Sequence, residues 1–502
     1  MRRWLSRTGL LVAALVLGFS TLLATCGYIA LPGGLVINFP SFPGSQTEPM
    51  TEEQLRSRLE LPDGFSIETW ATGMPNARLL MTTEAGDLLV TAPREGKIFL
   101  VRRDENGDGR ADGVEVLFDD LDRPHGVDWK DGSLYIAEGT AIARVSFDPA
   151  TRKVGDDITR IVTGLPDGGN HWTRTVHIGP DGKLYVAVGS SCNVCEEDDP
   201  RRAALVRYDL DGSNEELYAT GLRNTVDFAW RPGTKELYGT DNGRDLLGDD
   251  YPPEEINLIR EGGFYGWPYA NPPRKPDPDF GDVRPDKVAI SIPPAHDLPA
   301  HTAPLGIGFY EGTMFPEKYR GAAFVALHGS WNRREKQGYE VVTLFFAPDG
   351  SIQREPFLRN FEVDEDVTGR PVGIATGPDG ALYVSDDYTG SVYRIAFGEK
   401  PRSETGSIPQ PKAETDSNSA PAPAAPASTE AGKLLWEGSD CARCHVTGEA
   451  NAPPQPLTKL GQKYDVPSLA KFLASPQPPM PLYPFDEQQR RDLAAYLLKR
   501  FP

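Results

Sequence analysis

This chain of 502 residues has few cysteines and fewer basic than acidic residues. Its five cysteines are too few for disulfides to be the main scaffold of the fold. Acidic residues outnumber basic ones by 72 to 52, and the formal charge of −20 argues against a nucleic-acid partner. Convincing long helices are absent from the middle of the sequence, and the length suffices for two or three domains.

The N-terminus carries a long apolar run, residues 8–31, preceded by basic residues, a pattern typical of export. The run can also span a bilayer as an uncleaved anchor, and Cys26 stands in a box resembling a bacterial lipoprotein cleavage site. We expect residues 1–35 to be a cleaved signal peptide, a membrane anchor or a lipidated end, and residues 36–59 to be a tether. Each alternative places the bulk of the chain in the periplasm or cell envelope. Of the three, we favour an N-terminal segment that anchors the chain to the membrane.

The most specific motif lies near the C-terminus. Cys441 and Cys444 are followed at once by His445, which is the attachment pattern of a c-type haem. The alternative is half of a zinc site, but zinc needs about four ligands and this tail has no other Cys or His. Met480 is the one methionine that follows, so we expect it to be the second axial ligand. A haem of this kind carries single electrons.

A repeated unit fills the middle of the chain. Each unit is a turn, a strand, a second turn and a second strand, with Asp-Gly suited to the turns and Tyr, Val and Ile to the strands. Such repeats are typical of a β-propeller, although an unrelated all-β array is the alternative. We predict an all-β six-bladed β-propeller over residues 60–397. The units begin at Gly86, Asp131, Pro180, Gly233, Tyr319 and Pro378.

The composition changes after the last repeat. Residues 398–429 are rich in Pro, Ala, Ser and Glu, which indicates an extended linker. Residues 431–438 and 486–500 have helical periodicity. We therefore predict a small all-α cytochrome c domain over residues 430–502.

Loops that enter and leave the inner strands of a propeller meet at the mouth of its central channel. Arg or His recurs at the same position of successive repeats, although a single His before a strand is ordinarily structural. Arginines that converge on one channel would clamp a polyanionic, planar ligand. The candidate side chains are Arg123, His125, His171, Arg223, Asn224, His301, Asn332, Arg333 and Arg370.

With these residues in place, the propeller resembles the soluble sugar dehydrogenases that depend on pyrroloquinoline quinone, and more closely their sorbosone and pyranose dehydrogenase relatives. The resemblance covers nearly all of residues 60–397. The C-terminal segment resembles the cytochrome of dehydrogenases that pass electrons straight to a haem. The markers are His171 ahead of residues 179–182 (GPDG), then 221–224 (GLRN), 254–259 (EEINLI) and 265–268 (YGWP).

The resemblance implies pyrroloquinoline quinone as cofactor, a tricarboxylate that suits the arginines. It makes His171 the base that takes a hydroxyl proton while hydride goes to the quinone. Arg223 would stabilise charge on a quinone oxygen, and the carbonyls of Gly243 and Arg244 would help bind calcium. The residues implied to hold the cofactor are Asn224, His301, Arg333 and Arg370.

Two positions depart from the family pattern. Ser190 stands where the glucose enzymes carry an acidic residue that supports the histidine, and His301 replaces a smaller hydroxyl residue. The orienting partner of His171 is therefore open, and glucose itself is not implied as substrate. We expect a sugar or a related polyol or aldehyde.

Two further motifs allow alternatives. An acidic loop has the spacing of a twelve-residue calcium site but no flanking helices, so it is either a structural calcium in a hairpin loop or a solvated acidic turn. Cys192 and Cys195 form either a structural disulfide or a redox-active pair. The loop residues are Asp104, Asn106, Asp108, Asp112 and Glu115.

Three functional classes fit the sequence. The leading one is a quinone-dependent dehydrogenase that passes electrons to its own haem and then to a downstream acceptor, a cytochrome or the respiratory chain. The second is a calcium-dependent propeller hydrolase or lactonase, which the acidic loops favour and the haem disfavours. The third is a non-catalytic sugar-binding propeller with an electron-transfer tail.

Overall fold

A computed structural model describes residues 28–30, 36–38, 46–108, 110–399, 408–411, 427–438, 445, 457–474 and 487–501. The chain divides into two compact units, Met1–Ala413 and Glu414–Pro502. The division falls within the predicted linker, residues 398–429.

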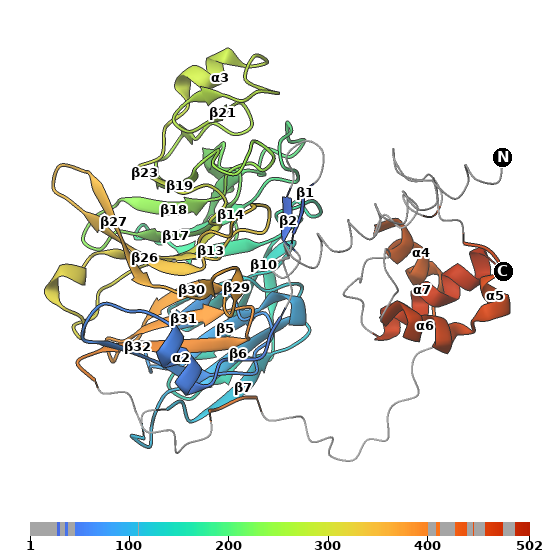
Figure 1. Ribbon diagram of the computed structural model, residues 1–502, viewed down its shortest axis with the longest axis horizontal. Coiled ribbons are helices and arrows are strands. Elements are labelled where there is room, and N and C mark those ends of the chain that lie inside the picture. Colours follow the sequence, from blue (N-terminus) through green and yellow to red (C-terminus); the bar gives the residue numbers. More distant parts are fainter. Residues whose placement is uncertain are drawn as a thin grey trace, which may run out of the picture. The chain divides into compact units, whose positions relative to one another are not determined.

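The first unit is a six-bladed β-propeller, which confirms the predicted fold of this region (Figure 1). Each blade is a mainly antiparallel sheet of four or five strands. Blade one contains β4 (Leu80–Thr82), β5 (Leu88–Ala92), β6 (Lys97–Arg102) and β7 (Gly113–Phe118). Blade two contains β8 (Gly126–Lys130), β9 (Ser133–Ala137), β10 (Ala141–Asp148), β11 (Lys153–Val154) and β12 (Thr159–Thr163). Blade three contains β13 (Arg174–Ile178), β14 (Leu184–Val188), β15 (Ala204–Tyr208), β16 (Glu216–Thr220) and β20 (Gly263–Phe264). Blade four contains β17 (Thr225–Trp230), β18 (Leu237–Asp241), β19 (Glu254–Ile259) and β23 (His296–Leu298). Blade five contains β24 (Pro304–Phe309), β25 (Ala323–Leu327), β26 (Glu340–Phe346) and β27 (Ile352–Leu358). Blade six contains β30 (Pro371–Thr376), β31 (Leu382–Asp386), β32 (Ser391–Phe397) and β3 (Phe65–Ala71).

The second strand of a blade explains why these segments form a propeller. β14 and β31 are buried along their whole length because both faces of each sheet pack against a neighbouring blade. Their apolar runs follow Asp-Gly turns in which Gly182 and Gly380 have φ of 76° and 82°, a region that glycine enters without strain. The turn and the apolar run together fix where each blade begins.

The N-terminal strand closes the ring. β3 pairs antiparallel with β32, and Phe65 is the register partner of Phe397. In Figure 1 the blue N-terminal segment accordingly lies beside the orange strands of the last blade. The sixth blade is therefore built from both ends of the propeller.

The predicted tether, residues 36–59, differs from the structure at its C-terminal end. Helix α2 (Glu52–Arg58) begins at Thr51, whose side chain forms a capping box with Gln54. Leu55 is fully buried in the core under the last two blades. This short helix is anchored by its one apolar side chain, Leu55, so it packs on the propeller instead of remaining extended.

Two excursions extend from the blades. The longer one, between β20 and β23, contains β21 (Ala270–Asn271), β22 (Lys275–Pro276) and α3 (Pro285–Ile290), at the top of Figure 1. Arg244 anchors it through an ion pair of 2.7 Å with Asp277. The shorter one is the hairpin of β28 (Glu362–Val363) and β29 (Asp366–Val367).

The second unit contains the helices α4 (Thr429–Gly438), α5 (Leu460–Lys463), α6 (Val466–Ala474) and α7 (Glu487–Arg500). Trp436, Leu469 and Leu493 are buried together in its core. Gly432 lets α4 approach α7, because a Cβ there would lie 2.0 Å from the backbone oxygen of Asp492. These helices are compatible with the predicted small all-α domain.

Near the N-terminus, β1 (Tyr28–Ala30) pairs with β2 (Val36–Asn38). Most of the apolar run, residues 8–31, lies outside the described residues. Within the part of the chain that the structure describes, no helix has the length and apolar character needed to cross a membrane.

Candidate functional site

A cavity of about 200 Å³ lies at one end of the ring of inner strands. Its lining comes mostly from loops that precede the first strand, or follow the second strand, of five of the six blades, together with Val226 and Leu305 at the starts of two first strands. This is the channel mouth at which the sequence predicted a site. The polar side chains that line it are Asn76, Arg78, Arg94, Asn170, His171, Thr173, Asn224, His328, Arg370 and Asp387.

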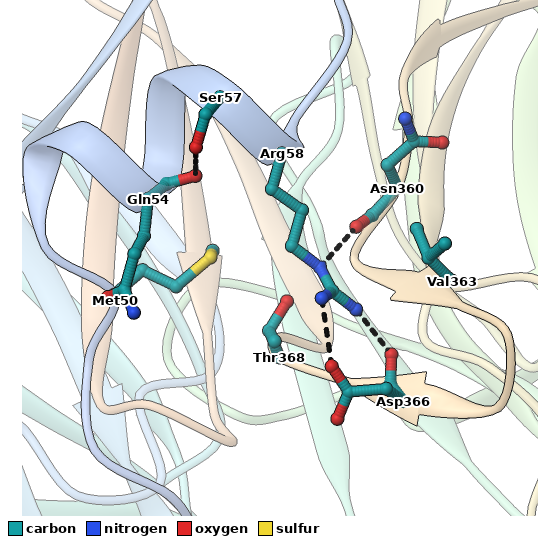
Figure 2. A pocket seen from close by; sticks show the side chains of 8 residues that line it. All are labelled: Met50, Gln54, Ser57, Arg58, Asn360, Val363, Asp366 and Thr368. Carbon is teal, nitrogen blue, oxygen red and sulfur yellow. Dashed lines mark hydrogen bonds and ion pairs between the residues drawn. The ribbon is translucent and has the colours of Figure 1, made fainter.

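A larger cavity of about 570 Å³ lies between α2 and the β28–β29 hairpin (Figure 2). Its charged lining residues, Arg58 and Asp366, neutralise each other in an ion pair of 2.8 Å. No histidine lines it. It therefore offers neither a base nor an uncompensated charge, and the cavity at the channel mouth is the candidate site.

His171, in the loop before β13, is held through one ring nitrogen. Its Nδ1 lies 2.8 Å from the hydroxyl and 3.0 Å from the carbonyl oxygen of Ser190. The Ser190 hydroxyl donates its own proton to the carbonyl of Cys192 at 2.8 Å, which assigns the ring proton to Nδ1. Nε2 has no hydrogen bond to a described residue, so it is the nitrogen that can accept a proton.

The surroundings keep the His171 ring neutral. Burial, followed by the positive charge of Arg223, holds the pKa of His171 well below its usual value. Gly189 fixes the ring from behind, because a Cβ there would lie 2.6 Å from the Cβ of His171 and 2.8 Å from Oδ1 of Asn224. The only residue that fits between these two cavity residues without moving them is glycine.

Ser190 is thus the orienting partner of His171, at the position where the glucose enzymes carry an acidic residue. It is fully buried. A hydroxyl orients the imidazole without raising its pKa, whereas a carboxylate at this place would favour the imidazolium. The substitution is therefore compatible with a base that remains unprotonated at neutral pH.

The opposite wall of the cavity is an ionic network. Nε2 of His328 lies 2.8 Å from one oxygen of Asp387, and Nη1 of Arg78 lies 2.8 Å from the other. Arg370 donates to the carbonyl oxygens of His328 and Gly329 at 3.2 and 2.8 Å. Burial, followed by the charge of Arg370, lowers the pKa of His328 to about 4. His328 is therefore neutral at neutral pH.

This wall carries more positive than negative charge. Arg78, Arg94 and Arg370 line it, against the one carboxylate of Asp387. The exposed Arg94 guanidinium has no hydrogen bond or ion pair to any residue that the structure describes. Nε of Arg78 is buried and likewise without a partner there. Donors thus remain for an anionic ligand.

A second group of predicted residues gathers around Asp245, outside the cavity lining. Nη2 of Arg223 lies 3.3 Å from Oδ2 of this aspartate, and Nδ2 of Asn332 donates to Oδ1 at 2.5 Å. Nδ1 of His301 lies 3.9 Å from the same Oδ1. The other Arg223 donors bond Asn193 and the carbonyl of Asn242. Arg223 therefore acts on the cavity through its charge.

Gly243 and Arg244 follow β18 beside a buried carboxylate. The amide of Gly243 donates to Oε2 of Glu254 at 2.5 Å, and burial raises the pKa of Glu254 to about 8. The Arg244 side chain is committed to Asp277 and Asp279. What Gly243 and Arg244 can offer a metal is their backbone carbonyl oxygens, the atoms predicted to bind calcium.

Three further predicted cofactor residues also lie outside the cavity lining. Arg123 pairs with Asp122 and Asp167 at 2.9 Å each. His125 is fully buried with Nδ1 3.1 Å from the hydroxyl of Thr175. The third, Arg333, binds the carbonyl of Asp249 and the carboxylate of Asp250.

The acidic loop connects β6 to β7, as the hairpin interpretation requires. Oxygens of Asp104, Asn106 and Asp108 accept backbone amides of the same loop at 2.7–2.8 Å. Asp112 accepts from Glu105 and Asn106, whereas Glu115 lies 3.6 Å from Arg102. Asp112 therefore joins the loop network, and Glu115 takes part in a separate ion pair.

Three of the predicted haem residues, Cys441, Cys444 and Met480, lie outside the described residues. The fourth, His445, is described, and its ring stacks on Trp436 with centroids 6.1 Å apart. Trp436 belongs to the buried core of the second unit. The histidine that would bind iron is thus packed against that core.

Sequence reasoning did not select Arg78, Arg94, His328 or Asp387 as site residues. Arg78 precedes β4 and Arg94 follows β5, just as Arg370 precedes β30 and Asp387 follows β31. The repeat could have revealed them, but β4 has only three residues and the turn after it, residues 84–86, reads Glu-Ala-Gly instead of containing Asp-Gly. The first inner strand was therefore invisible in the pattern.

Residues 81–403 match a family model described as "Domain of unknown function (DUF7133)". An uncharacterized protein of Borreliella burgdorferi is 30% identical over 366 residues, which are 69% of this chain and 92% of that protein. A pyrroloquinoline quinone-dependent pyranose dehydrogenase of Coprinopsis cinerea is 27% identical over 417 residues. That match covers 68% of this chain and 55% of the enzyme, so the chain spans about half of the enzyme's length.

Solved structures share the propeller. The holo form of the pyranose dehydrogenase PQQ domain from Coprinopsis cinerea aligns with a TM-score of 0.58 at 24% identity, over 70% of this chain and 99% of that domain. A calcium structure of a Trichoderma reesei enzyme of carbohydrate-active family AA12 gives the same TM-score at 20% identity, over 70% and 99%. These likenesses show the fold.

Proposed function

Because this chain belongs to the family described as a domain of unknown function (DUF7133), which carries no reaction with it, we propose its function from the site and the relatives. We propose a pyrroloquinoline quinone-dependent dehydrogenase that oxidises a sugar or a related polyol or aldehyde and passes the electrons to its own c-type haem. The pyranose dehydrogenase and an aldose sugar dehydrogenase of Escherichia coli, 23% identical over 285 residues, are relatives of this kind.

One observation carries the proposal: the cavity places a neutral histidine opposite a cationic wall. Pyrroloquinoline quinone is planar and carries three carboxylates, which match the arginines of that wall. Arg94 and Nε of Arg78 are without partners among the described residues, so they can bind carboxylates without breaking existing bonds. The donors present therefore fit the cofactor.

His171 supplies the base in this proposal. Nδ1 carries a proton and donates it in a hydrogen bond to Ser190, while Nε2 takes the proton of the substrate hydroxyl. The quinone, when bound, supplies the acceptor for the hydride. Asn224, next to His171 on the cavity wall, would hold the cofactor together with Arg370. Arg223 contributes positive charge that keeps His171 unprotonated between turnovers.

Calcium would be held by the carbonyl oxygens of Gly243 and Arg244. Hard oxygen ligands are what calcium prefers. The side chain of Glu254 accepts the Gly243 amide, and Asp245 follows Arg244 directly in the chain. The metal would supply positive charge next to the quinone. The acidic hairpin loop remains a second proposed calcium site.

The haem would be attached through Cys441 and Cys444, with His445 and Met480 as axial ligands. The Cys-x-x-Cys-His motif supports this part of the proposal. Electrons would leave the haem one at a time to a cytochrome or respiratory-chain acceptor. Thioether haem and the basic, apolar N-terminus both favour the periplasm or cell envelope, with the N-terminus at the membrane.

The test is reconstitution of the purified full-length protein with quinone and calcium. Sugars, polyols and aldehydes should then reduce a small dye, and omission of quinone should abolish the reaction. Haem should remain on the polypeptide in a denaturing gel and be lost after Cys441→Ala with Cys444→Ala. If no candidate substrate supports dye reduction by quinone-loaded protein, the dehydrogenase proposal is wrong.

A second measurement addresses the electron relay. The chain is cut within residues 398–429, and haem reduction by substrate is followed before and after the cut. In the intact chain it should be independent of protein concentration, because the linker holds the haem at about millimolar effective concentration. In the separated halves it should become concentration-dependent. Substrate that never reduces the haem of intact, quinone-loaded protein would exclude the relay.

A further inference from the structure

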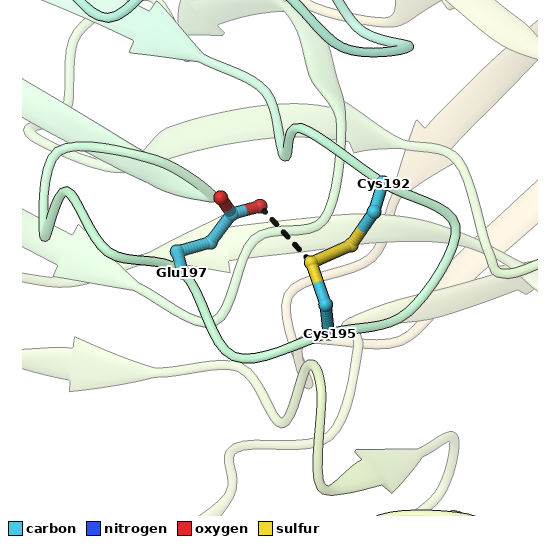
Figure 3. Close-up of side chains that lie close together, drawn as sticks. All are labelled: Cys192, Cys195 and Glu197. Atoms are coloured by element: carbon cyan, nitrogen blue, oxygen red, sulfur yellow. Dashed lines mark hydrogen bonds between the residues drawn. A yellow bond between two sulfur atoms is a disulfide. The ribbon is translucent and has the colours of Figure 1, made fainter.

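A disulfide closes the turn between Cys192 and Cys195 (Figure 3). The turn follows β14 and begins immediately after Ser190 and Ser191. The two cysteines form a disulfide, and both are half-buried, so a small reagent can reach them. The disulfide encloses only Asn193 and Val194.

Asn193 connects this turn to the charged side of the site. Its carbonyl accepts Nε of Arg223 at 3.0 Å and the indole nitrogen of Trp267 at 3.2 Å. Its side-chain oxygen accepts Nη2 of Arg223 at 2.9 Å and the amide of Asp245 at 2.8 Å. Its side-chain nitrogen Nδ2 donates to the carbonyl of Asp245 at 3.1 Å. Arg223 and the Asp245 segment are therefore both aligned on one enclosed residue.

Cys192 connects the same turn to the base. Its carbonyl accepts the Ser190 hydroxyl at 2.8 Å, and that hydroxyl lies 2.8 Å from Nδ1 of His171. The chain from turn to imidazole thus consists of two hydrogen bonds. A change of backbone direction at Cys192 would move the acceptor that fixes the Ser190 rotamer and, with it, the His171 ring.

The far side of the turn is closed by Glu197. Its carboxylate accepts the amide and hydroxyl of Ser191 at 2.6 and 2.7 Å, and Oε1 lies 3.9 Å from Sγ of Cys195 (Figure 3). A carboxylate so close to sulfur disfavours a thiolate there. The surroundings thus favour a disulfide that holds the turn over a dithiol pair that exchanges electrons during turnover.

We propose that the Cys192–Cys195 disulfide is a positioning element for His171 and Arg223, so that its reduction reversibly lowers turnover. The catalytic part rests on the proposed function. A dithiol reductant breaks the S–S bond, gives two cysteine thiols and becomes a cyclic disulfide, which balances two electrons and two protons. Opening the bond frees the backbone of Cys192 and Asn193, on which both side chains depend.

The first measurement needs neither cofactor nor substrate. Full-length protein is treated with a dithiol, alkylated, and checked by mass spectrometry for label on both Cys192 and Cys195. Carbethoxylation of histidines by diethyl pyrocarbonate is then followed peptide by peptide. The rate at His171 should rise about two- to fivefold, on the scale of one lost hydrogen bond. His296, on the outer strand β23 away from the turn, is the internal control and should not change.

The second measurement is steady-state dye reduction by quinone-loaded protein after removal of the reductant. We expect kcat to fall about 10- to 100-fold, the effect of misplacing a catalytic group by about 1 Å. Quinone affinity should stay within about twofold, because the cationic wall is untouched. Cys192→Ser with Cys195→Ser should reproduce both effects without the alkyl groups. An aliquot re-oxidised with glutathione disulfide before alkylation should regain the parent rate.

The two hypotheses fail in different ways. If both cysteines are alkylated while kcat and the His171 modification rate equal those of the parent, the positioning role is wrong and the dehydrogenase stands. If no substrate supports dye reduction even in the parent, the proposed function fails. The modification rate at His171 then decides alone whether the turn positions the ring.

Discussion

The channel mouth and the channel wall each hold a histidine from the same blade, and their environments are opposite. His171, in the loop before β13, bonds the neutral Ser190, and its pKa is held well below the usual value. His177, within β13, lies between Asp227 at 2.9 Å and Asp128 at 3.7 Å. Burial alone would lower the pKa of His177, but the two carboxylates raise it to about 10.

The partner of the ring explains the difference. A hydroxyl and a carbonyl fix His171 without charging it, and one ring nitrogen stays available for a proton. Two carboxylates from the neighbouring inner strands β8 and β17 favour the protonated form of His177, and each lies within ion-pair distance of one ring nitrogen. The same type of side chain is thereby a base at the mouth and a half-buried cation that connects three blades in the channel wall.

The largest expected effect is a loss of turnover when the histidine at the channel mouth is replaced. His171→Ala should lower kcat/KM about 10²–10⁴-fold, because the general base is lost. Its free energy of unfolding should change by less than about 1 kcal/mol, since among the described residues the ring forms hydrogen bonds to Ser190 alone. Dye reduction and urea unfolding measure the two quantities. Parent turnover in this variant would remove His171 from the mechanism.

The wall variant should show the reverse pattern. His177→Gln leaves Asp128 and Asp227 without their cation and should lower the free energy of unfolding by about 1–3 kcal/mol. Because His177 does not line the cavity, kcat/KM of the folded protein should stay close to that of the parent. A variant with parent stability and lost activity would reverse the assignment of the two histidines.

A smaller effect separates ligand binding from stability at the mouth. Arg94→Ala should weaken quinone binding about tenfold, the loss of one charge-assisted hydrogen bond. Its unfolding free energy should not change, because the guanidinium bonds no described residue. Arg354→Ala, on the exposed outer strand β27, is the matched control. Equal affinity of the two variants would place the cofactor away from Arg94.

The last prediction is a dependence of the free energy of unfolding on pH. The pKa of His177 is 6.5 in the unfolded chain and about 10 in the folded one, so its stabilisation is complete below pH 6.5 and is lost as the pH rises towards 10. The slope in this window should reach at most about 1.4 kcal/mol per pH unit. Urea unfolding at pH 6.5, 8 and 9.5 should show it in the parent and not in His177→Gln. Parallel curves would contradict the charged state of His177.

The repeated turn and apolar strand were sufficient to predict the propeller. They did not predict β3 as the outer strand of the last blade, because that pairing joins Phe65 to Phe397 across the whole domain. Helix α2 was also missed, since seven residues give too short a period to recognise before its burial is known. Long-range closure and short packed elements are decided by tertiary contacts, which sequence periodicity does not contain.

The sequence predicted where the candidate site lies but not in which direction its side chains point. The repeat placed Arg223 and Asn224 together at the mouth, yet Asn224 lines the cavity and Arg223 bonds the disulfide turn. Adjacent residues of an extended chain point to opposite sides, so the sequence alone could not choose between them. The role of Ser190 likewise depended on which atoms folding brought to Nδ1 of His171.

The pairing of Phe65 with Phe397 also bears on how such a ring can be rearranged. Paired residues of neighbouring antiparallel strands are about 5 Å apart, so a few residues can join position 64 to position 398. New chain ends can then be opened in a connection between blades remote from the mouth, a circular permutation that exposed loops tolerate. The ring has no obligatory first blade. The position of the chain ends in the sequence, and not the geometry of the propeller, therefore decides to which blade the C-terminal unit is connected.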